Sequence, residues 1–464
     1  MLLRILLSIF LCFPITVLAT PDSGRIPPLE LSYFVQDILT GEVIAEHRAD
    51  IPMNPASVMK LVTSYAALET LGKDFRWHTK WSARAPINQG ILDGNIFWQG
   101  TGDPMMEQKD IINMQEQLRQ KGIHTINGYL VLDRSAWSSN GSAEQFESDE
   151  GKSFTIPPDQ HMLSYKVIWI EAFKNSSGKM DVSTNPPFAN IDVKKNIQTI
   201  GGKCNRFNRM IKVYWDGEAL HINGKIPATC SGQRTYVNVL TSQQFAAESF
   251  IGQWKFAGGK GNIQIREGSL PENSQTLAEH LSPPLSEVIR DMNKVSDNLI
   301  ARTLFLTLGA NKEGDTIQNA RNTVFESFKR TGVPTDSLIL ENGSGLSRIE
   351  RVSTRTLGTM LYRAYYEPQF GQAFIDSLPI AGVDGTLRRR LKDVPNLTMK
   401  TGTLKNVRAL AGYKLPDNED EHPLAIAIII NSPQSVAYLS DMDNLVRSLV
   451  KEYNQSQNRV SSQL

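Results

Sequence analysis

A serine and a lysine three residues apart could supply a nucleophile and its base. Ser57 and Lys60 stand in the run Ser57-Val58-Met59-Lys60. A serine hydroxyl is a poor nucleophile until a neighbouring base takes its proton, and a lysine can do this when burial and nearby cations lower its pKa. Residues i and i+3 share one face of a helix, so the amine can reach the hydroxyl. Alone the pair is a weak signal, because a helix-start serine followed by a solvated lysine has the same sequence.

A second group of polar residues is Ser296-Asp297-Asn298. Ser296 could pass a proton between the lysine and a leaving amine, and Asn298 could hold both Lys60 and a substrate amide by hydrogen bonds. The tripeptide alone is also typical of a helix cap, in which Ser and Asp bond their own backbone. Its chemical interpretation therefore depends on the other groups.

The third group is Lys400-Thr401-Gly402-Thr403, at the end of a strand-like run. Lys400 and Thr401 could bind a substrate carboxylate, and Gly402 allows a close backbone approach. The amides of Thr403 and Ser57 could stabilise an oxyanion. A strand end with a surface lysine is the ordinary alternative, but three such groups in this order are hard to obtain by chance.

The elements that must position these groups are predicted from residue periodicity and end signals. Asn54 is a good N-cap and Pro55 suits the first position of a helix whose apolar residues recur until Gly72. The other elements predicted around the groups are a hairpin at 29–35 and 43–45, a helix at 285–308, strands at 398–403, 407–415 and 424–431, and a C-terminal helix at 436–449.

The middle of the chain has a different pattern, with short strand-like pieces and few helix signals between residues 82 and 280. This predicts an α+β fold, an antiparallel sheet flanked by helices, that carries a large β-rich insertion. The predicted organisation is a discontinuous catalytic domain at 20–82 and 281–453, an inserted region of one or two domains at 83–280, and a polar, disordered tail at 454–464.

The N-terminus predicts export. Residues 1–19 hold a single charge, Arg4, then an apolar run, and end in Val17-Leu18-Ala19, which suits a signal-peptidase site. Without the leader two cysteines remain, Cys204 and Cys230, and in an exported protein such a pair most often forms a disulfide. Two thiols are too few for a metal site to be expected.

Charge gives no indication of a polyanionic partner. The 49 Lys and Arg residues balance 48 Asp and Glu, so no net field favours nucleic acid or anionic lipid. No later segment is apolar enough for a membrane span, and no stable membrane anchor is expected.

The three groups resemble the three motifs of penicillin-binding proteins and serine β-lactamases. The long gap between the first two motifs resembles the low-molecular-mass class C group, the D-alanyl-D-alanine carboxypeptidase/endopeptidases of the peptidase S13 type, which carry extra domains there. Further similarity is found in three stretches: Thr101-Gly102-Asp103-Pro104, Gly343-Ser344-Gly345-Leu346-Ser347-Arg348 and Ala381-Gly382-Val383-Asp384-Gly385-Thr386-Leu387.

The resemblance implies a periplasmic serine hydrolase that acts on peptidoglycan stem peptides. The penultimate D-alanine would acylate Ser57, the terminal D-amino compound would leave, and water would hydrolyse the acyl-enzyme. No cofactor is implied, and β-lactams would acylate the same serine as covalent inhibitors. The resemblance does not distinguish trimming of a terminal D-alanine from cutting of a D-Ala cross-link.

Two departures from the group are present. Asn342 stands where an aspartate usually precedes Gly-Ser-Gly, and the stretch from Trp137 to Phe188 does not follow the usual pattern. The first concerns a supporting loop. The second concerns specificity.

Two alternative functions remain open from the sequence. A β-lactamase would share the motifs, but the glutamate of a Glu-x-x-x-Asn loop is not found between Asn298 and Lys400. A non-catalytic wall-binding scaffold would be expected to lose Ser57, Lys60 or Lys400, and all three are present. A Ser-His-Asp hydrolase is disfavoured, since none of the seven histidines lies in a recognisable catalytic motif.

Overall fold

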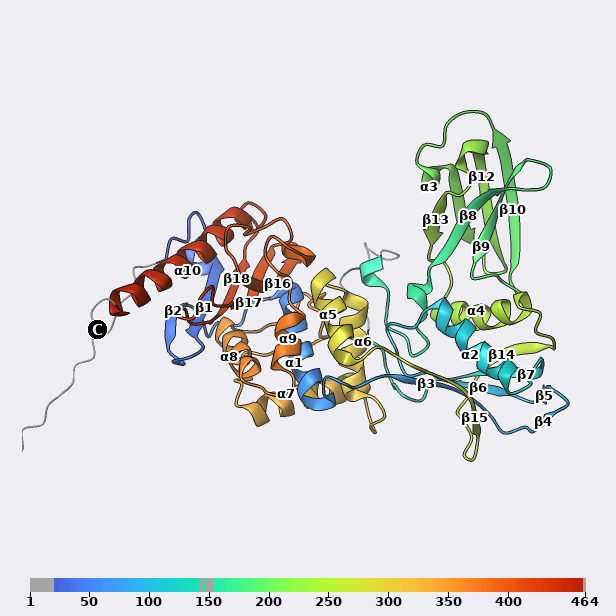
Figure 1. Cartoon of the computed structure of the whole chain (residues 1–464), viewed down its shortest axis with the longest axis horizontal. Coiled ribbons are helices and arrows are strands. Elements are labelled where there is room, and N and C mark those ends of the chain that lie inside the picture. Colours follow the sequence, from blue (N-terminus) through green and yellow to red (C-terminus); the bar gives the residue numbers. More distant parts are fainter. Residues whose placement is uncertain (1–20, 142–145, 147–152, 462–464) are drawn as a thin grey trace, which may run out of the picture.

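The chain forms an elongated molecule in which a helix-rich body and a strand-rich body lie side by side (Figure 1). The computed structural model describes residues 21–141, Phe146 and residues 153–461. The predicted signal peptide at 1–19 lies outside the described residues.

The first body is built on a five-stranded antiparallel sheet in the order β16-β17-β18-β1-β2. Its N-terminal hairpin and its three C-terminal strands confirm the predictions for these segments. The strands are β1 (Leu31–Asp37), β2 (Val43–His47), β16 (Leu397–Leu404), β17 (Val407–Lys414) and β18 (Leu424–Asn431).

Helices cover both faces of this sheet (Figure 1). In β18, Ile428 and Ile430 pack with α10, while Ala427 and Ile429 belong to the core formed with the other helices. This alternation follows from the two-residue period of a strand, and coverage on both faces explains why β18 is apolar throughout. The predicted α+β class is confirmed. The helices are α1 (Met59–Leu71), α5 (Leu285–Val295), α6 (Asn298–Gly309), α7 (Thr316–Thr331), α8 (Thr354–Tyr365), α9 (Gly371–Asp376) and α10 (Leu439–Ser461).

The predicted start of the first helix is wrong by four residues. Pro55 is not its first residue; a 3₁₀ turn, η2 (Ala56–Val58), comes first and α1 begins at Met59. The Asn54 side chain accepts a hydrogen bond from the Ala56 amide at 2.9 Å, and Ala56 has φ 46°, which the regular α-helix does not allow. Ser57 therefore lies in a tight turn directly before the helix.

The helix predicted at 285–308 is two helices, and the break between them is the Ser-Asp-Asn group. Ser296 ends α5 with φ 64°, and the Asp297 side chain caps α6 by accepting from the Ile300 amide at 2.9 Å. The helix-cap interpretation is thus correct for Asp297. It also leaves Ser296 at a corner between two helices.

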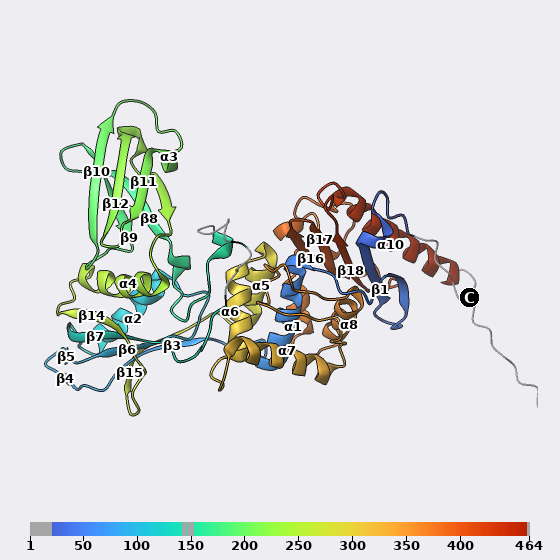
Figure 2. The ribbon, with the colours of Figure 1, turned by 180° about the vertical axis from the view of Figure 1, so that it is seen from behind.

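The second body lies between β3 (His78–Ala83) and β15 (Gln275–Leu281), which pair antiparallel and connect it to the first body (Figure 2). They belong to a seven-stranded sheet, and two three-stranded sheets extend from it. The other strands of the large sheet are β4 (Ile87–Asn88), β5 (Ile91–Asp93), β6 (Ile96–Gln99), β7 (Thr125–Asp133) and β14 (Ile263–Glu267). The small sheets hold β8 (Ile168–Lys174), β9 (Met180–Asn185) and β13 (Arg234–Val237), and β10 (Asp192–Ile200), β11 (Ile211–Trp215) and β12 (Ala219–Pro227).

Two full helices in this body were not predicted. α2 (Gln108–Gln120) buries Ile111, Met114 and Leu118 at helical spacing, and α4 (Ser242–Phe256) begins with a capping box in which Thr241 and Gln244 bond each other's backbone. Both signals are present in the sequence. The short strands that dominate the surrounding residues hide these signals.

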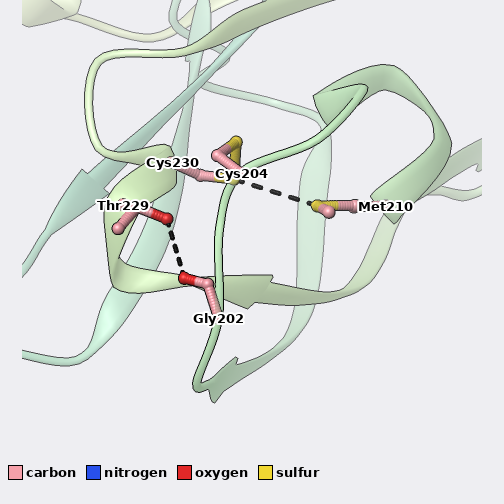
Figure 3. Close-up of a disulfide and its surroundings, with 5 residues drawn as sticks. All are labelled: Gly202, Cys204, Met210, Thr229 and Cys230. Atoms are coloured by element: carbon pink, nitrogen blue, oxygen red, sulfur yellow. Dashed lines mark hydrogen bonds between the residues drawn. A yellow bond between two sulfur atoms is a disulfide. The ribbon is translucent and has the colours of Figure 1, made fainter.

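The predicted disulfide joins Cys204 and Cys230, whose Cα atoms are 5.0 Å apart (Figure 3). It closes a loop with a sequence separation of 26 residues. The nearby Thr229 hydroxyl donates to the Gly202 carbonyl at 3.1 Å, so the same two segments are also joined by a hydrogen bond.

The C-terminal segment at 454–464, predicted to be disordered, is helical as far as Ser461 because α10 continues through it. Across the residues with described structure, no helix combines the length and the apolar composition needed to cross a bilayer.

Candidate active site

The Lys60 amine is the centre of the candidate site. Its Nζ donates to Ser57 Oγ at 3.1 Å, to Asn298 Oδ1 at 2.6 Å and to the Ser344 carbonyl at 2.6 Å. The first and second predicted motifs, 238 residues apart in the chain, therefore meet at one nitrogen.

Burial prepares this amine to act as a base. The Lys60 side chain is fully buried, and desolvation lowers its pKa to about 7, although the carboxylates of Asp297 and Glu350 oppose the shift. A lysine with this pKa is partly neutral at physiological pH. It can then accept the proton of Ser57, which lies within hydrogen-bond reach.

The Lys400 amine lies on the other side of Ser296. Its Nζ donates to Ser296 Oγ at 2.8 Å and to the Thr401 carbonyl at 2.7 Å. The side chain is fully buried, and burial together with the positive charge of Lys60 holds its pKa well below the usual value. Lys400 is thus not the surface lysine of the ordinary interpretation.

The edge of β16 is packed against the turn that carries Ser57. A Cβ atom on Gly402 would lie 2.4 Å from the Pro55 carbonyl oxygen, so only glycine permits this approach. Met399 donates its amide to Pro379 on the free edge of the sheet. Because alternate strand residues face the same edge, the Thr403 amide also points away from β17.

The position of Thr401 is set by a neighbouring loop. Its hydroxyl donates to Thr386 Oγ1 at 2.7 Å, and Thr386 belongs to η7 (Gly385–Leu387). Asp384 fixes the approach to this turn, because it accepts from the Ile380 amide at 2.8 Å and from Lys294 Nζ at 2.6 Å. This is the third stretch that resembles the penicillin-binding proteins.

A buried glutamate shapes the loop that holds Lys60. Glu350 accepts backbone N–H bonds of 2.8–3.0 Å from Glu341, Asn342 and Gly343 through Oε1, and from Gly345 through Oε2. Burial raises the pKa of Glu350, and the N–H donors act in the opposite direction. The glutamate thereby fixes the loop whose Ser344 carbonyl accepts from Lys60.

Asn342 fits this loop better than an aspartate would. Its amide nitrogen donates to the Leu346 carbonyl at 2.8 Å, and its Oδ1 accepts from both the amide and the hydroxyl of Ser344. A carboxylate could accept the last two bonds but could not donate the first.

The second body touches the site directly. The Tyr165 hydroxyl donates to Asp297 Oδ2 at 2.9 Å, and Asn298 Nδ2 donates to the Phe154 carbonyl at 3.2 Å. Tyr165 lies in η5 (Ser164–Lys166) and Phe154 in η4 (Ser153–Thr155). The Ser-Asp-Asn motif is therefore held from both bodies.

Ser57, Asn298 and Thr403, one residue from each of the three predicted groups, line a cleft of about 570 Å³. Arg348 and Lys405 also line it and make its mouth cationic. Among the described residues, no group of three or more His, Cys, Asp or Glu side chains could hold a metal ion. The cleft suits acyl transfer to a serine from a substrate that bears a carboxylate.

The model of the D-Ala-D-Ala carboxypeptidase 3 (S13) family matches residues 18–451. This chain belongs to that family. The family membership confirms the predicted enzyme class, a serine-type D-Ala-D-Ala carboxypeptidase, and the predicted resemblance to low-molecular-mass penicillin-binding proteins.

The curated relatives carry the same activity in their names. The chain is 29% identical over 394 residues to the D-alanyl-D-alanine carboxypeptidase DacB of Haemophilus influenzae, covering 82% of each protein. It is 27% identical over 441 residues to a D-alanyl-D-alanine carboxypeptidase of an Actinomadura species, covering 90% of this chain and 80% of the relative.

The fold also agrees with solved structures. Penicillin binding protein 4 of Haemophilus influenzae superimposes with a TM-score of 0.71 at 27% identity, covering 91% of this chain and 96% of that one. A second structure of that protein, in complex with a β-lactam, gives a TM-score of 0.68 at 26% identity.

The structure brings together the residues of all three predicted motifs. It adds groups that were not predicted as site residues, namely Ser344, Glu350, Tyr165, Phe154 and Thr386. Ser344 and Thr386 lay in stretches noted for their resemblance. Glu350 acts through backbone amides, and the Tyr165 contact spans 132 residues, so neither leaves a local sequence pattern.

Proposed function

We propose that Ser57 is the nucleophile of D-Ala-D-Ala cleavage and Lys60 its base. The Ser57 oxygen attacks the carbonyl carbon of the penultimate D-alanine while its proton moves to Lys60. The amides of Ser57 and Thr403 receive the developing oxyanion. The C–N bond then breaks, and Ser296 relays a proton to the leaving amine. Water hydrolyses the resulting ester and restores the serine.

The observation that carries this proposal is the Lys60 amine, buried, with a pKa near 7, and 3.1 Å from Ser57 Oγ. Lys400 and Thr401 would bind the substrate carboxylate. Lys400 would act through its positive charge, because Ser296 lies between its amine and the cleft. A bound carboxylate would raise the pKa of Lys400 and keep it charged. Gly402 permits the approach of β16, and Asn298 aligns Lys60 with the substrate amide.

The same proposal divides the chain into a catalytic domain and an inserted region and places the protein in the periplasm. Residues 20–82 and 281–453 would form the catalytic domain and residues 83–280 an inserted region, which the pairing of β3 with β15 supports. The predicted leader at 1–19 and the disulfide support export to the periplasm, where peptidoglycan stem peptides would be the substrates. β-Lactams would acylate Ser57 as covalent inhibitors.

The test uses fluorescent penicillin and purified muropeptides. We expect the wild-type protein to be labelled and to release D-alanine or to cut D-Ala cross-links, and mass analysis of the products distinguishes these two reactions. Ser57→Ala should lose labelling and lower turnover by about 10⁴-fold or more. Its unfolding midpoint should stay close to that of the wild type, because a single half-buried hydroxyl is removed.

A matched control is Ser176→Ala, an exposed serine in the second body. It should be labelled like the wild type. Unchanged hydrolysis by Ser57→Ala would refute the nucleophile assignment. Rapid turnover of nitrocefin by the wild type would favour the β-lactamase alternative, and absence of any covalent adduct would favour the scaffold.

A further inference from the structure

A second and larger hollow lies next to the catalytic cleft, on the second body. Its volume is about 860 Å³, within the range of pockets that hold organic ligands. We call it the aromatic groove, and its defining residues are Phe154, Tyr165, Trp169, Asn185, Tyr236 and Asn238.

Two large rings of the groove are left open to solvent. Trp169 and Tyr236 are 44% and 58% exposed. They stand opposite each other on β8 and β13, with ring centroids 5.6 Å apart in an edge-to-face arrangement. Adjacent exposed aromatic side chains in a hollow are a mark of a binding surface, because a protein normally covers such area.

The groove carries no net charge. Glu107 and Lys109 are its charged lining residues, and they pair with each other at 2.7 Å. The remaining lining residues are apolar, aromatic, amide or hydroxyl. The catalytic cleft differs, since Arg348 and Lys405 make it cationic. An acidic peptide therefore fits the cleft, and an uncharged ligand fits the groove.

The cleft and the groove meet at a shared lining residue, Phe154. Phe154 lines both hollows, and its carbonyl accepts from Asn298 of the catalytic motif at 3.2 Å. A polymeric substrate with its peptide at Ser57 would thus pass over Phe154 into the groove. Four of the six defining residues of the groove come from the stretch between Trp137 and Phe188, which departs from the usual sequence pattern of the family.

We propose that the aromatic groove binds the glycan strand of the polymeric substrate, an uncharged chain of N-acetylated amino sugars. The C–H faces of the sugar rings would pack on Trp169 and Tyr236, and the acetamido and hydroxyl groups would pair with Asn185 and Asn238. This inference rests on the proposed function only in assuming that the peptide bound at Ser57 is attached to a glycan.

The test measures binding of the N-acetylglucosamine tetramer, which carries no peptide, to the whole protein by calorimetry. The wild type should bind it saturably, and Trp169→Ala and Tyr236→Ala should each weaken binding by roughly tenfold or more. Tyr214→Ala is the matched control, because Tyr214 is 39% exposed on the other small sheet, outside the groove. It should bind like the wild type.

The unfolding midpoint of each variant shows whether it is folded. Because Trp169→Ala and Tyr236→Ala are made separately, the test still works if one of them does not fold. Two further measurements separate the glycan inference from the assignment of Ser57 as the nucleophile. They are tetramer binding by Ser57→Ala and penicillin labelling of the wild type. Labelling without tetramer binding would overturn the glycan inference alone. Tetramer binding that survives in both ring variants, or that a sugar-free stem peptide displaces, would also overturn it.

A second readout uses the reaction. Trp169→Ala should lower kcat/KM for glycan-linked peptide relative to that for sugar-free peptide, because the ring would contact only the former. An equal change for both substrates would contradict a glycan site.

Discussion

The two bodies of the molecule differ in the cations that they bury. In the part of the chain that the structure describes, the fully or nearly buried cations are Lys60, Arg302, Lys400 and Lys414, and all belong to the first body. Both bodies bury acids, such as Glu350 in the first body and Asp133 in the second, and Asp133 accepts from the backbone amides of Ser135 and Leu270. The cations and the acids require different explanations.

Buried acids bonded to backbone amides stabilise local structure, because their charge is compensated where it lies. Lys60 and Lys400 are different, since their amines donate to neutral oxygens and burial lowers both pKa values. A buried cation without an ion-pair partner costs stability. The comparison shows that the protein buries unpaired cations, at a cost in folding stability, next to the nucleophile, where a lysine base is needed.

Removing the base is the strongest test of this difference within the first body. Lys60→Met keeps a long side chain but cannot take the serine proton. We expect kcat/KM to fall by about 10²–10⁴-fold, the usual contribution of a general base. The measurement is D-alanine release, and normal turnover in this variant would mean that another group activates Ser57.

The pH dependence sharpens the same point. Since burial lowers the pKa of Lys60 to about 7, the amine is protonated below that pH and neutral above it. The kcat/KM of the wild type should therefore fall as pH decreases, by about tenfold per unit below about pH 7. A flat profile down to about pH 5 would show that the lysine is not the base whose proton state limits the reaction.

A smaller effect is expected from the glutamate that supports the loop. Glu350→Gln keeps the size and shape of the side chain, but one carboxylate oxygen becomes an NH2 group. This donor would face backbone N–H groups that are also donors. We expect a loss of about 1–3 kcal/mol in stability and a fall of about tenfold in kcat/KM as Ser344 shifts. Glu341→Gln, at a half-buried neighbouring residue, is the control and should change neither strongly. Equal effects of the two would contradict a special role for Glu350.

The smallest effect on catalysis is expected in the second body. A variant with Cys204→Ser and Cys230→Ser should lose about 3 kcal/mol of unfolding free energy. Without the disulfide, the segment between these residues is no longer restricted in the unfolded chain. Penicillin labelling under native conditions should not change. Denaturant unfolding and labelling measure the two effects, and loss of labelling before unfolding would link the disulfide to the site.

The sequence indicates the grouping of the motif residues better than it indicates the fold of the second body. Each motif lies on a short element with its own periodicity, so Ser57, Ser296 and Lys400 could be found locally. The helix break at Ser296 was hidden because apolar residues at helical spacing continue on both sides of it. α2 and α4 carried usable signals at Ile111 and Thr241.

Other features have no local pattern. The bond from Tyr165 to Asp297 depends on how two bodies pack, and the low pKa of Lys60 depends on burial by distant segments. These are properties of tertiary structure. They can be reasoned about only when the segments have been brought together.

The most direct test of the account is to locate the penicillin adduct by peptide mass spectrometry. Trypsin cuts after Arg48 and after Lys60, and Ser57 is the only serine or threonine in the peptide between these cuts. The account predicts that the adduct lies on this peptide, at Ser57, and that Lys60→Met acylates far more slowly. An adduct on any other peptide would contradict the central claim.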